Sequence, residues 1–188
     1  MPISVFKGRT TGAQIDHKLA YKANSRVALT DWSRKTKHEN EISFTKYQCD
    51  ENNEHCRDFM ERYPLGRRLN YDEQQKYKYN IVVDGCAWAA RLPNIISNGF
   101  LTFYHSIWVS WSTTVLRPFE HYIPLPVTGD YELLERSLDY FKNKDGKAKK
   151  IAMDGMKFTQ EMMRKQDKIA YILLVMLEYA NISEATEY

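Results

Sequence analysis

The stretch Tyr77-Lys78-Tyr79-Asn80-Ile81-Val82-Val83-Asp84-Gly85 decides the fold. It alternates aromatic and polar residues, becomes a β-branched run, and stops at a turn-forming Asp-Gly pair, a pattern typical of a strand that enters a core. Beyond the turn, residues 87–92 and 95–96 carry apolar side chains at helical spacing, and Asn98-Gly99 is a typical helix stop. The sequence therefore predicts a strand followed by a helix.

Similar signals alternate along the rest of the chain. Residues 100–104 and 121–125 are strand candidates, and residues 131–142, 147–164 and 167–180 are predicted helices. This βαβ spacing predicts an α/β fold, a Rossmann-like parallel sheet with helices on both faces. The length of 188 residues suits a single domain, residues 1–188, in which the polar region of about 30–70 is predicted to be connection and surface helix.

Composition excludes several classes of function. The formal net charge of +3 is too small to demand nucleic acid as a partner, and the aromatic residues are not interleaved with the basic ones as a stacking groove requires. Basic residues gather early in the chain, and they are predicted to form a solvated face; the alternative is that some of them focus an anionic ligand toward a cleft. They are Lys18, Lys22, Arg26, Arg34, Lys35 and Lys37.

Cysteine spacing argues against a zinc site, and hydropathy argues against a membrane helix. No zinc spacing occurs, while Cys49 and Cys56 are compatible either with a small disulfide loop or with two free thiols. Residues 1–11 contain no apolar segment of signal-peptide length. The apolar run Ile169–Leu177 is less than half of the roughly twenty residues that a membrane helix needs, and it is predicted to be a buried helix.

Two loops are predicted to meet at the carboxyl edge of the sheet, where ligands bind in doubly wound folds. In the first, Lys7–Gly12, the glycines let backbone amides approach an anion; the alternative is a plain surface turn. The second loop follows Asp84, and its small residues leave room for a ligand to approach the backbone. Arg91 can then donate two parallel hydrogen bonds to a diphosphate; the alternative is a surface helix with an ordinary arginine. Asp84 either orients Arg91 or simply starts the turn.

From Val5 onward the chain resembles, segment by segment and in order, the C-terminal half of glycosyltransferase family 90, the Rumi (protein O-glucosyltransferase) and capsule-associated xylosyltransferase family. The matching segments are Phe6-Lys7-Gly8-Arg9-Thr10-Thr11-Gly12, Phe44-Thr45-Lys46, Lys76–Asn80 with Asp84-Gly85 and Arg91, Leu116-Arg117-Pro118-Phe119-Glu120-His121-Tyr122-Ile123-Pro124, Ile151-Ala152 with Gly155, and Tyr171–Tyr179. They are similar to the family's Phe-Arg-Gly-Ser-x-Thr-Gly element, its Lys-Tyr strand with Asp-Gly turn and arginine, and its Leu-x-Pro-Trp-x-His-Tyr-x-Pro signature.

The resemblance implies the donor-binding half of a GT-B glycosyltransferase, which transfers glucose or xylose from UDP to a protein or glycan hydroxyl. It implies neither a cofactor nor a metal, and it suggests the lumen of the secretory pathway. In the Rumi group the catalytic carboxylate lies in the N-terminal, acceptor-binding half, so no catalytic residue is assigned here and the isolated chain is expected to be inactive. The alternative is a catalytically inactive member that serves as a binding or scaffold module.

Carried over residue by residue, the resemblance implies a nucleotide-sugar site made by Gly8, Arg9, Thr10, Thr11, Asp84, Gly85, Cys86, Ala87, Trp88, Ala89, Ala90 and Arg91. Lys7 stands where the family has arginine, and Ile107 stands near a position where many members have an acidic residue. His121 is predicted to buttress a strand end rather than to act as a general base. Trp108 and Trp111 are predicted to pack in the core; the alternative is a platform on which a base stacks.

Overall fold

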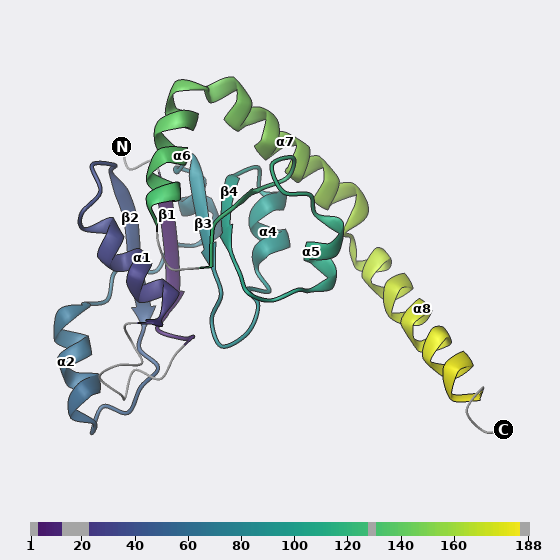
Figure 1. Cartoon of the computed structure of the whole chain (residues 1–188), viewed down its shortest axis with the longest axis horizontal. Coiled ribbons are helices and arrows are strands. Elements are labelled where there is room, and N and C mark those ends of the chain that lie inside the picture. The colour runs from purple at the N-terminus through teal and green to yellow at the C-terminus, as the bar shows by residue number, and fades with distance from the viewer. Residues whose placement is uncertain (1–3, 13–22, 128–130, 185–188) are drawn as a thin grey trace.

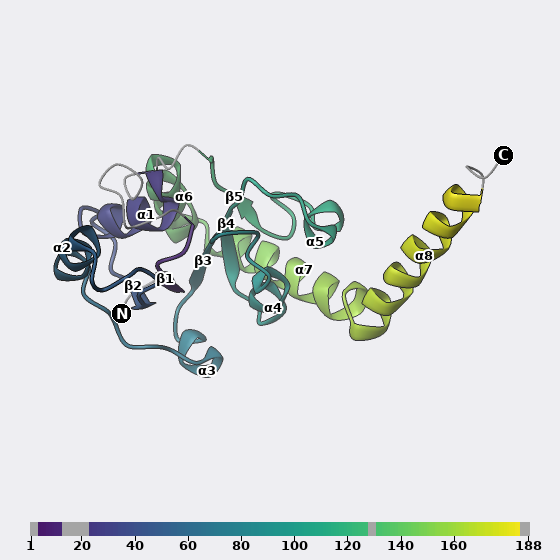
Figure 2. The ribbon, with the colours of Figure 1, turned by 90° about the horizontal axis from the view of Figure 1, so that it is seen from below.

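The structure, a computed structural model, describes residues 4–12, 23–127 and 131–184. Parallel strands form one five-stranded sheet in the order β2-β1-β3-β4-β5. The strands are β1 (Ser4–Arg9), β2 (Asn40–Lys46), β3 (Tyr79–Val83), β4 (Leu101–His105) and β5 (Ile123–Pro124). Helices cover both faces of this sheet (Figures 1 and 2). The predicted α/β class is therefore confirmed.

Short polar caps begin several of the helices. Asn24 precedes α1 and accepts hydrogen bonds from the Arg26 and Val27 amides, and Asn53 caps α2 in the same way. The helices are α1 (Ser25–Ser33), α2 (Glu54–Arg62), α3 (Tyr71–Gln74), α4 (Leu92–Ser97), α5 (Trp111–Val115), α6 (Glu132–Asn143), α7 (Asp145–Met162) and α8 (Lys165–Glu184).

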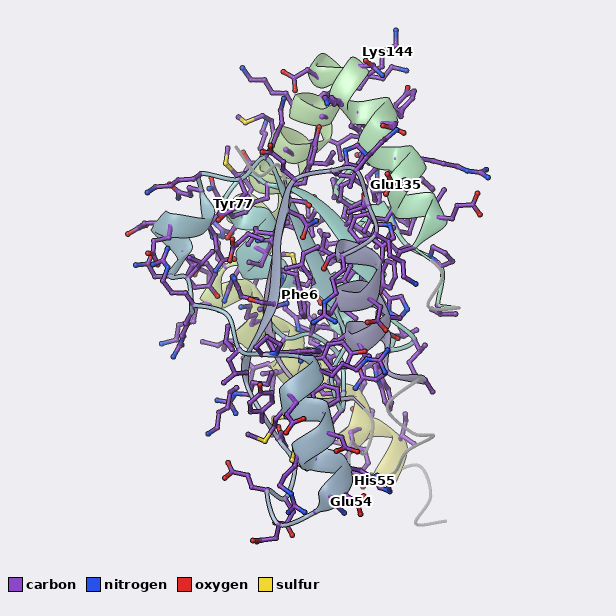
Figure 3. The ribbon with its side chains drawn as sticks, turned by 90° about the vertical axis from the view of Figure 1, so that its left-hand side faces the viewer. Phe6, Glu54, His55, Tyr77, Glu135 and Lys144 are labelled. Atoms are coloured by element: carbon purple, nitrogen blue, oxygen red, sulfur yellow. A yellow bond between two sulfur atoms is a disulfide. The ribbon has the colours of Figure 1, made fainter. Side chains whose placement is uncertain are left out.

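The central strand β3 is buried on both faces, and its side chains alternate between two clusters. Ile81 and Val83 pack in the cluster that includes α1 and α6, whereas Val82 packs in the cluster that includes α4. Because both faces of a parallel strand are covered, such a strand is apolar along its whole length. Phe6 on β1 joins the first cluster and lies in the middle of the body (Figure 3).

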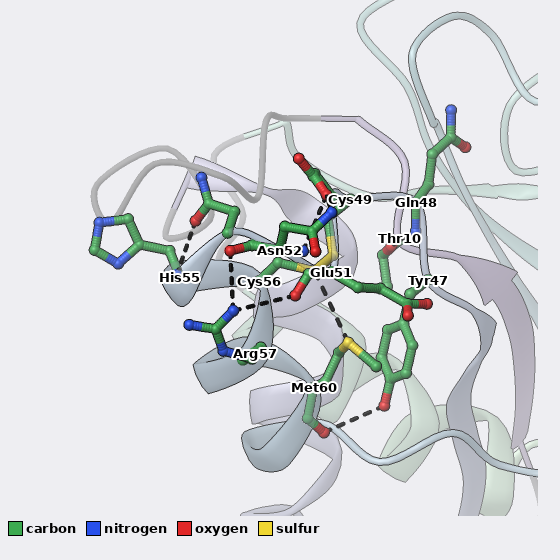
Figure 4. Close-up of a disulfide and its surroundings, with 12 residues drawn as sticks. Thr10, Tyr47, Gln48, Cys49, Glu51, Asn52, His55, Cys56, Arg57 and Met60 are labelled. Carbon is green, nitrogen blue, oxygen red and sulfur yellow. Dashed lines mark hydrogen bonds between the residues drawn. A yellow bond between two sulfur atoms is a disulfide. The ribbon is translucent and has the colours of Figure 1, made fainter.

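A third, smaller cluster attaches α2 to β2. Phe44 of β2 contacts Phe59 and Tyr63 of the α2 segment. A disulfide between Cys49 and Cys56 joins the loop after β2 to the same helix (Figure 4). Of the two possibilities that the sequence leaves open for this pair, the structure has the disulfide.

The prediction for residues 30–70 was wrong about β2, which lies inside the region expected to hold only connections and surface helix. Phe44 is the strand's buried side chain, so its hydrophobic signal in the sequence is weak. Hydrogen bonds to β1 along the strand from Ser4 to Arg9, together with the α2 cluster, hold it in the sheet.

The prediction of a buried C-terminal helix was also wrong. Helix α8 points away from the sheet and its helices (Figures 1 and 2), and residues 169–177 are exposed along their whole length. Tyr171 does contact Trp111 of α5, with ring centroids 6.0 Å apart. Apolar composition predicted burial correctly only where another element lies against the helix. Within the described residues, no helix is long and apolar enough to cross a membrane.

Candidate functional site

The carboxyl ends of β1 and β3 bring the two predicted loops together at one edge of the sheet. Gly12 has a φ of +113°, and a Cβ atom added to it would lie 3.2 Å from the carbonyl oxygen of Gly85. A Cβ atom on Gly85 would lie 2.5 Å from Thr11 Oγ1. The predicted meeting of the loops is confirmed. Gly12 needs glycine because its φ lies in the left-handed region, and Gly85 leaves room for the Thr11 side chain.

The first loop begins later than predicted. Gly8 and Arg9 belong to β1, not to a turn, and a Cβ atom on Gly8 would lie 2.6 Å from Cζ of Phe6. Gly8 thus makes room for the Phe6 ring. Thr10, 1% exposed, accepts a hydrogen bond from the Gln48 amide through its hydroxyl (2.7 Å).

Beyond their first two residue pairs, Ser4 with Tyr79 and Val5 with Asn80, β1 and β3 are not paired with each other. Two arginine side chains bind the carbonyl groups of this part of the strands. The first is Arg26 of α1, and the second is Arg91, which follows the β3 turn.

Arg26 binds both strand ends at once. Its Nη1 donates to the carbonyl of Arg9 (2.8 Å) and to Oγ1 of Thr11 (2.6 Å). Its Nε donates to the carbonyl of Asp84 (2.8 Å) and its Nη2 to that of Val83 (3.0 Å). Burial lowers the pKa of Arg26, and the nearby Asp84 carboxylate partly offsets that shift.

Arg91 is held less completely. Its Nη1 donates to the carbonyl of Lys7 (2.5 Å), and its Cζ lies 5.2 Å from the centroid of the Phe6 ring. Its Nη2 is enclosed and has no hydrogen-bond partner within the part of the chain that the structure describes. Burial, together with the positive charge of Arg26, lowers the pKa of Arg91 to about 10, so the group remains charged at neutral pH.

The position of Arg91 in the secondary structure differs from the prediction. It is the residue before the first turn of α4, whereas the helix was predicted to begin at about residue 87. Pro93 is tolerated only within a first turn, and it therefore fixes the start of the helix at Leu92. The preceding residues form turns, in which the Gly85 amide bonds to the carbonyl of Ala87 and the Leu92 amide to that of Ala89.

The carboxylate of Asp84 joins two loops. Oδ1 accepts from the amide of Ala89 (3.2 Å), and Oδ2 accepts from the amide of Ile107, in the loop after β4 (2.9 Å). Of the two predicted roles, the structure supports the turn rather than the orientation of Arg91. The site residues predicted around this turn differ in exposure: Asp84 and Ala89 are buried, whereas Cys86, Ala87, Trp88 and Ala90 are exposed. Arg9, at the end of β1, is exposed as well.

Sequence reasoning missed Arg26, which was placed on a solvated face but is 8% exposed. The signal was the helix cap, because a residue two positions after an N-cap asparagine lies at the helix start, beside the strand ends. His121 was predicted correctly as a buttress: its Nδ1 accepts from the Arg117 amide and its ring stacks on Phe158 at 4.4 Å. Trp108 is exposed, so its predicted core role was wrong, whereas Trp111 is half-buried and packs against the cluster that includes α4.

The family model of glycosyl transferase family 90 matches residues 2–186. The chain belongs to glycosyltransferase family 90. It is 32% identical over 120 residues to Protein O-glucosyltransferase 2 of Danio rerio, covering 63% of this chain and 24% of that protein. It is 28% identical over 120 residues to O-glucosyltransferase rumi of Drosophila melanogaster, covering 63% of this chain and 29% of that one. The chain thus spans only about a quarter of these relatives.

The fold of this family 90 chain is similar to that of sucrose-phosphate synthase from Thermosynechococcus elongatus, with a TM-score of 0.59 and 12% identity. The match covers 98% of this chain and 46% of that one. At this identity the likeness shows the fold alone, and it confirms the predicted resemblance to one half of a GT-B glycosyltransferase.

The two departures from the family pattern have different surroundings. Lys7 Nζ bonds to Glu41 Oε1 (2.5 Å) and Ser43 Oγ (2.7 Å), so its charge is already paired on β2. The Ile107 side chain is 68% exposed, while its amide is held by Asp84. Among the described residues no group of three or more His, Cys, Asp or Glu side chains is arranged to hold a metal ion.

Proposed function

We propose that the edge between β1 and β3 binds the diphosphate of a UDP-sugar, UDP-glucose or UDP-xylose. The observation that carries this proposal is the enclosed guanidinium of Arg91, whose Nη2 lacks a partner among the described residues. Arg26 places a second positive charge nearby, and the oxygens of Asp84 are already bound by amides. A buried charge is costly unless it is paired, and an anion that enters between the loops would pair it.

We further propose that the chain is the donor-binding half of an enzyme that glycosylates a protein or glycan hydroxyl. Transfer to a hydroxyl requires a group that takes up its proton. Asp84, the carboxylate placed at this edge by the sequence motif, is engaged with two amides and is poorly suited to that role. An acceptor half would supply the base, and the isolated chain is expected to release no sugar to an acceptor.

A second candidate is a catalytically inactive family member that acts as a binding module. The exposed Ile107 side chain favours it, because an apolar group there cannot form the polar contacts of an acidic one. UDP binding by the purified chain distinguishes a donor site from a module that has lost its ligand.

The test is calorimetry with UDP, UMP and uridine. Arg91→Ala should weaken UDP binding by about 1.5–3 kcal/mol, the range for hydrogen bonds to charged groups, and Arg91→Lys should recover only part of it. A diphosphate anchor predicts that the loss shrinks for UMP and vanishes for uridine. Arg136→Ala, which removes an exposed arginine of α6, is the control and should change nothing.

Equal losses for all three ligands would mean that Arg91 acts through its bond to Lys7 and supports the fold instead. No UDP binding by the unmodified chain would refute the donor site and leave the binding module.

The secretory-pathway lumen is the proposed location. The Cys49–Cys56 disulfide supports it, because such bonds persist in oxidising compartments. Mass spectrometry of the protein from its native cells, alkylated before lysis, would show whether the bond is present there.

A further inference from the structure

We infer that Arg26 is a positioning residue for this donor site: without touching the ligand, its guanidinium sets the separation of the two loops that bind the diphosphate. The inference rests on the proposed function. It is carried by the four hydrogen bonds of one side chain, two to each strand end.

The bonds of Arg26 replace a missing part of the sheet. Pairing between β1 and β3 ends at Val5 and Asn80, so from there to the strand ends no backbone ladder fixes their distance. One planar fork spans this gap, with Arg9 and Thr11 on one side and Val83 and Asp84 on the other. Gly12 and Gly85, which follow directly on either side, are thereby held in contact.

The base of the Arg26 side chain is itself anchored. Arg26 is the second residue of α1, whose cap Asn24 also donates from Nδ2 to the carbonyl of Thr11 (3.2 Å). The carbonyl of Ser25 accepts from the hydroxyl of Tyr131, before α6 (2.8 Å). The helix start that carries Arg26 is therefore held against the first loop and against the segment before α6, so the side chain reaches both loops from a fixed base.

The hydrogen-bond partners of the two arginines separate this role from direct binding. Four of the five N–H donors of Arg26 are used by the protein, and the side chain is 8% exposed. Arg91, by contrast, retains an unpaired Nη2. Arg91 is therefore available to bind the anion, whereas Arg26 holds the two loops in position around it.

Lysine is the informative replacement, because its ammonium keeps the charge but cannot span four acceptors in one plane. Arg26→Lys should remain folded by circular dichroism and bind UDP at least tenfold more weakly. Amide hydrogen exchange should accelerate at residues 10–12 and 85–89. The exchange rates of the remaining amides should change only as far as the free energy of unfolding of the whole chain changes. Arg91→Lys should weaken UDP binding without accelerating exchange at residues 10–12.

Leu29→Ala is the matched control, since Leu29 lies in the same helix, is fully buried and does not contact the edge through a hydrogen bond. It should lower stability and leave UDP affinity within about twofold. Arg26→Lys that binds UDP like the unmodified chain would overturn the inference, as would loop exchange no faster than in Leu29→Ala. Failure of the unmodified chain to bind UDP would instead refute the proposed function, and the exchange comparison would still decide whether Arg26 couples the loops.

Discussion

Gly155 in the middle of α7 provides a stringent test of the packing that supports β5 and its preceding loop. A Cβ atom at this position would lie 2.5 Å from the carbonyl oxygen of His121 and 2.9 Å from Cγ2 of Ile96. Both separations are shorter than real carbon contacts. The carbonyl belongs to the backbone, which cannot rotate away as the end of a flexible side chain can.

Gly155→Ala therefore places two effects in opposition. Alanine in a helix interior is more favourable than glycine by about 1 kcal/mol. Overpacking a well-filled interior costs typically about 1–3 kcal/mol, and the upper part of that range applies because the obstacle is a carbonyl group. We expect a net loss of about 1–2 kcal/mol in the free energy of unfolding.

Urea unfolding measures this difference as a lower midpoint with an unchanged m-value. Gly146→Ala is the control, because it lies in the first turn of the same helix and a Cβ atom there would meet nothing within 4 Å. That variant should be equally or slightly more stable than the unmodified chain. A Gly155→Ala variant as stable as the Gly146→Ala variant would show that α7 does not pack rigidly against the His121 backbone, and would refute the reasoning.

Two further predictions concern acid stability and the exposed helix. Burial lowers the pKa of His105 in the folded chain. Below about pH 6.5, the usual pKa of histidine, the unfolded chain therefore binds a proton at this residue more readily than the folded chain does. The free energy of unfolding should consequently fall as the pH drops from 7 to 5. His105→Phe should flatten this dependence in urea titrations at several pH values, and an unchanged slope would contradict it. Leu174→Glu in α8 should change stability by no more than about 0.5 kcal/mol because the side chain is 61% exposed, whereas Leu134→Glu, at a fully buried position, should abolish folding. Strong destabilisation by Leu174→Glu would show that α8 packs against the body.

The alternation that ends at Asp84-Gly85 predicted β3, and the strand and helix signals that follow it predicted the parallel sheet. Together with Lys7–Gly12, that turn predicted the meeting of two glycine loops. The strand could be predicted because β3 is buried on both faces, and burial imposes an apolar run that remains visible in the sequence. The family resemblance was equally visible, because its elements are local segments in a fixed order, and the match to residues 2–186 confirms it.

Other features were decided only by the tertiary structure, because they depend on which distant groups meet. The strand β2 is held by backbone bonds to β1 together with the α2 cluster, and backbone bonds leave little trace in the side chains. The charge of Arg26 suggested a solvated face, yet its partners lie up to 58 residues away in sequence, at strand ends that no local pattern places beside it. For α8 the sequence determined an apolar helix, but whether an apolar helix is buried depends on the presence of a surface against it, and the described fold places it outside the body.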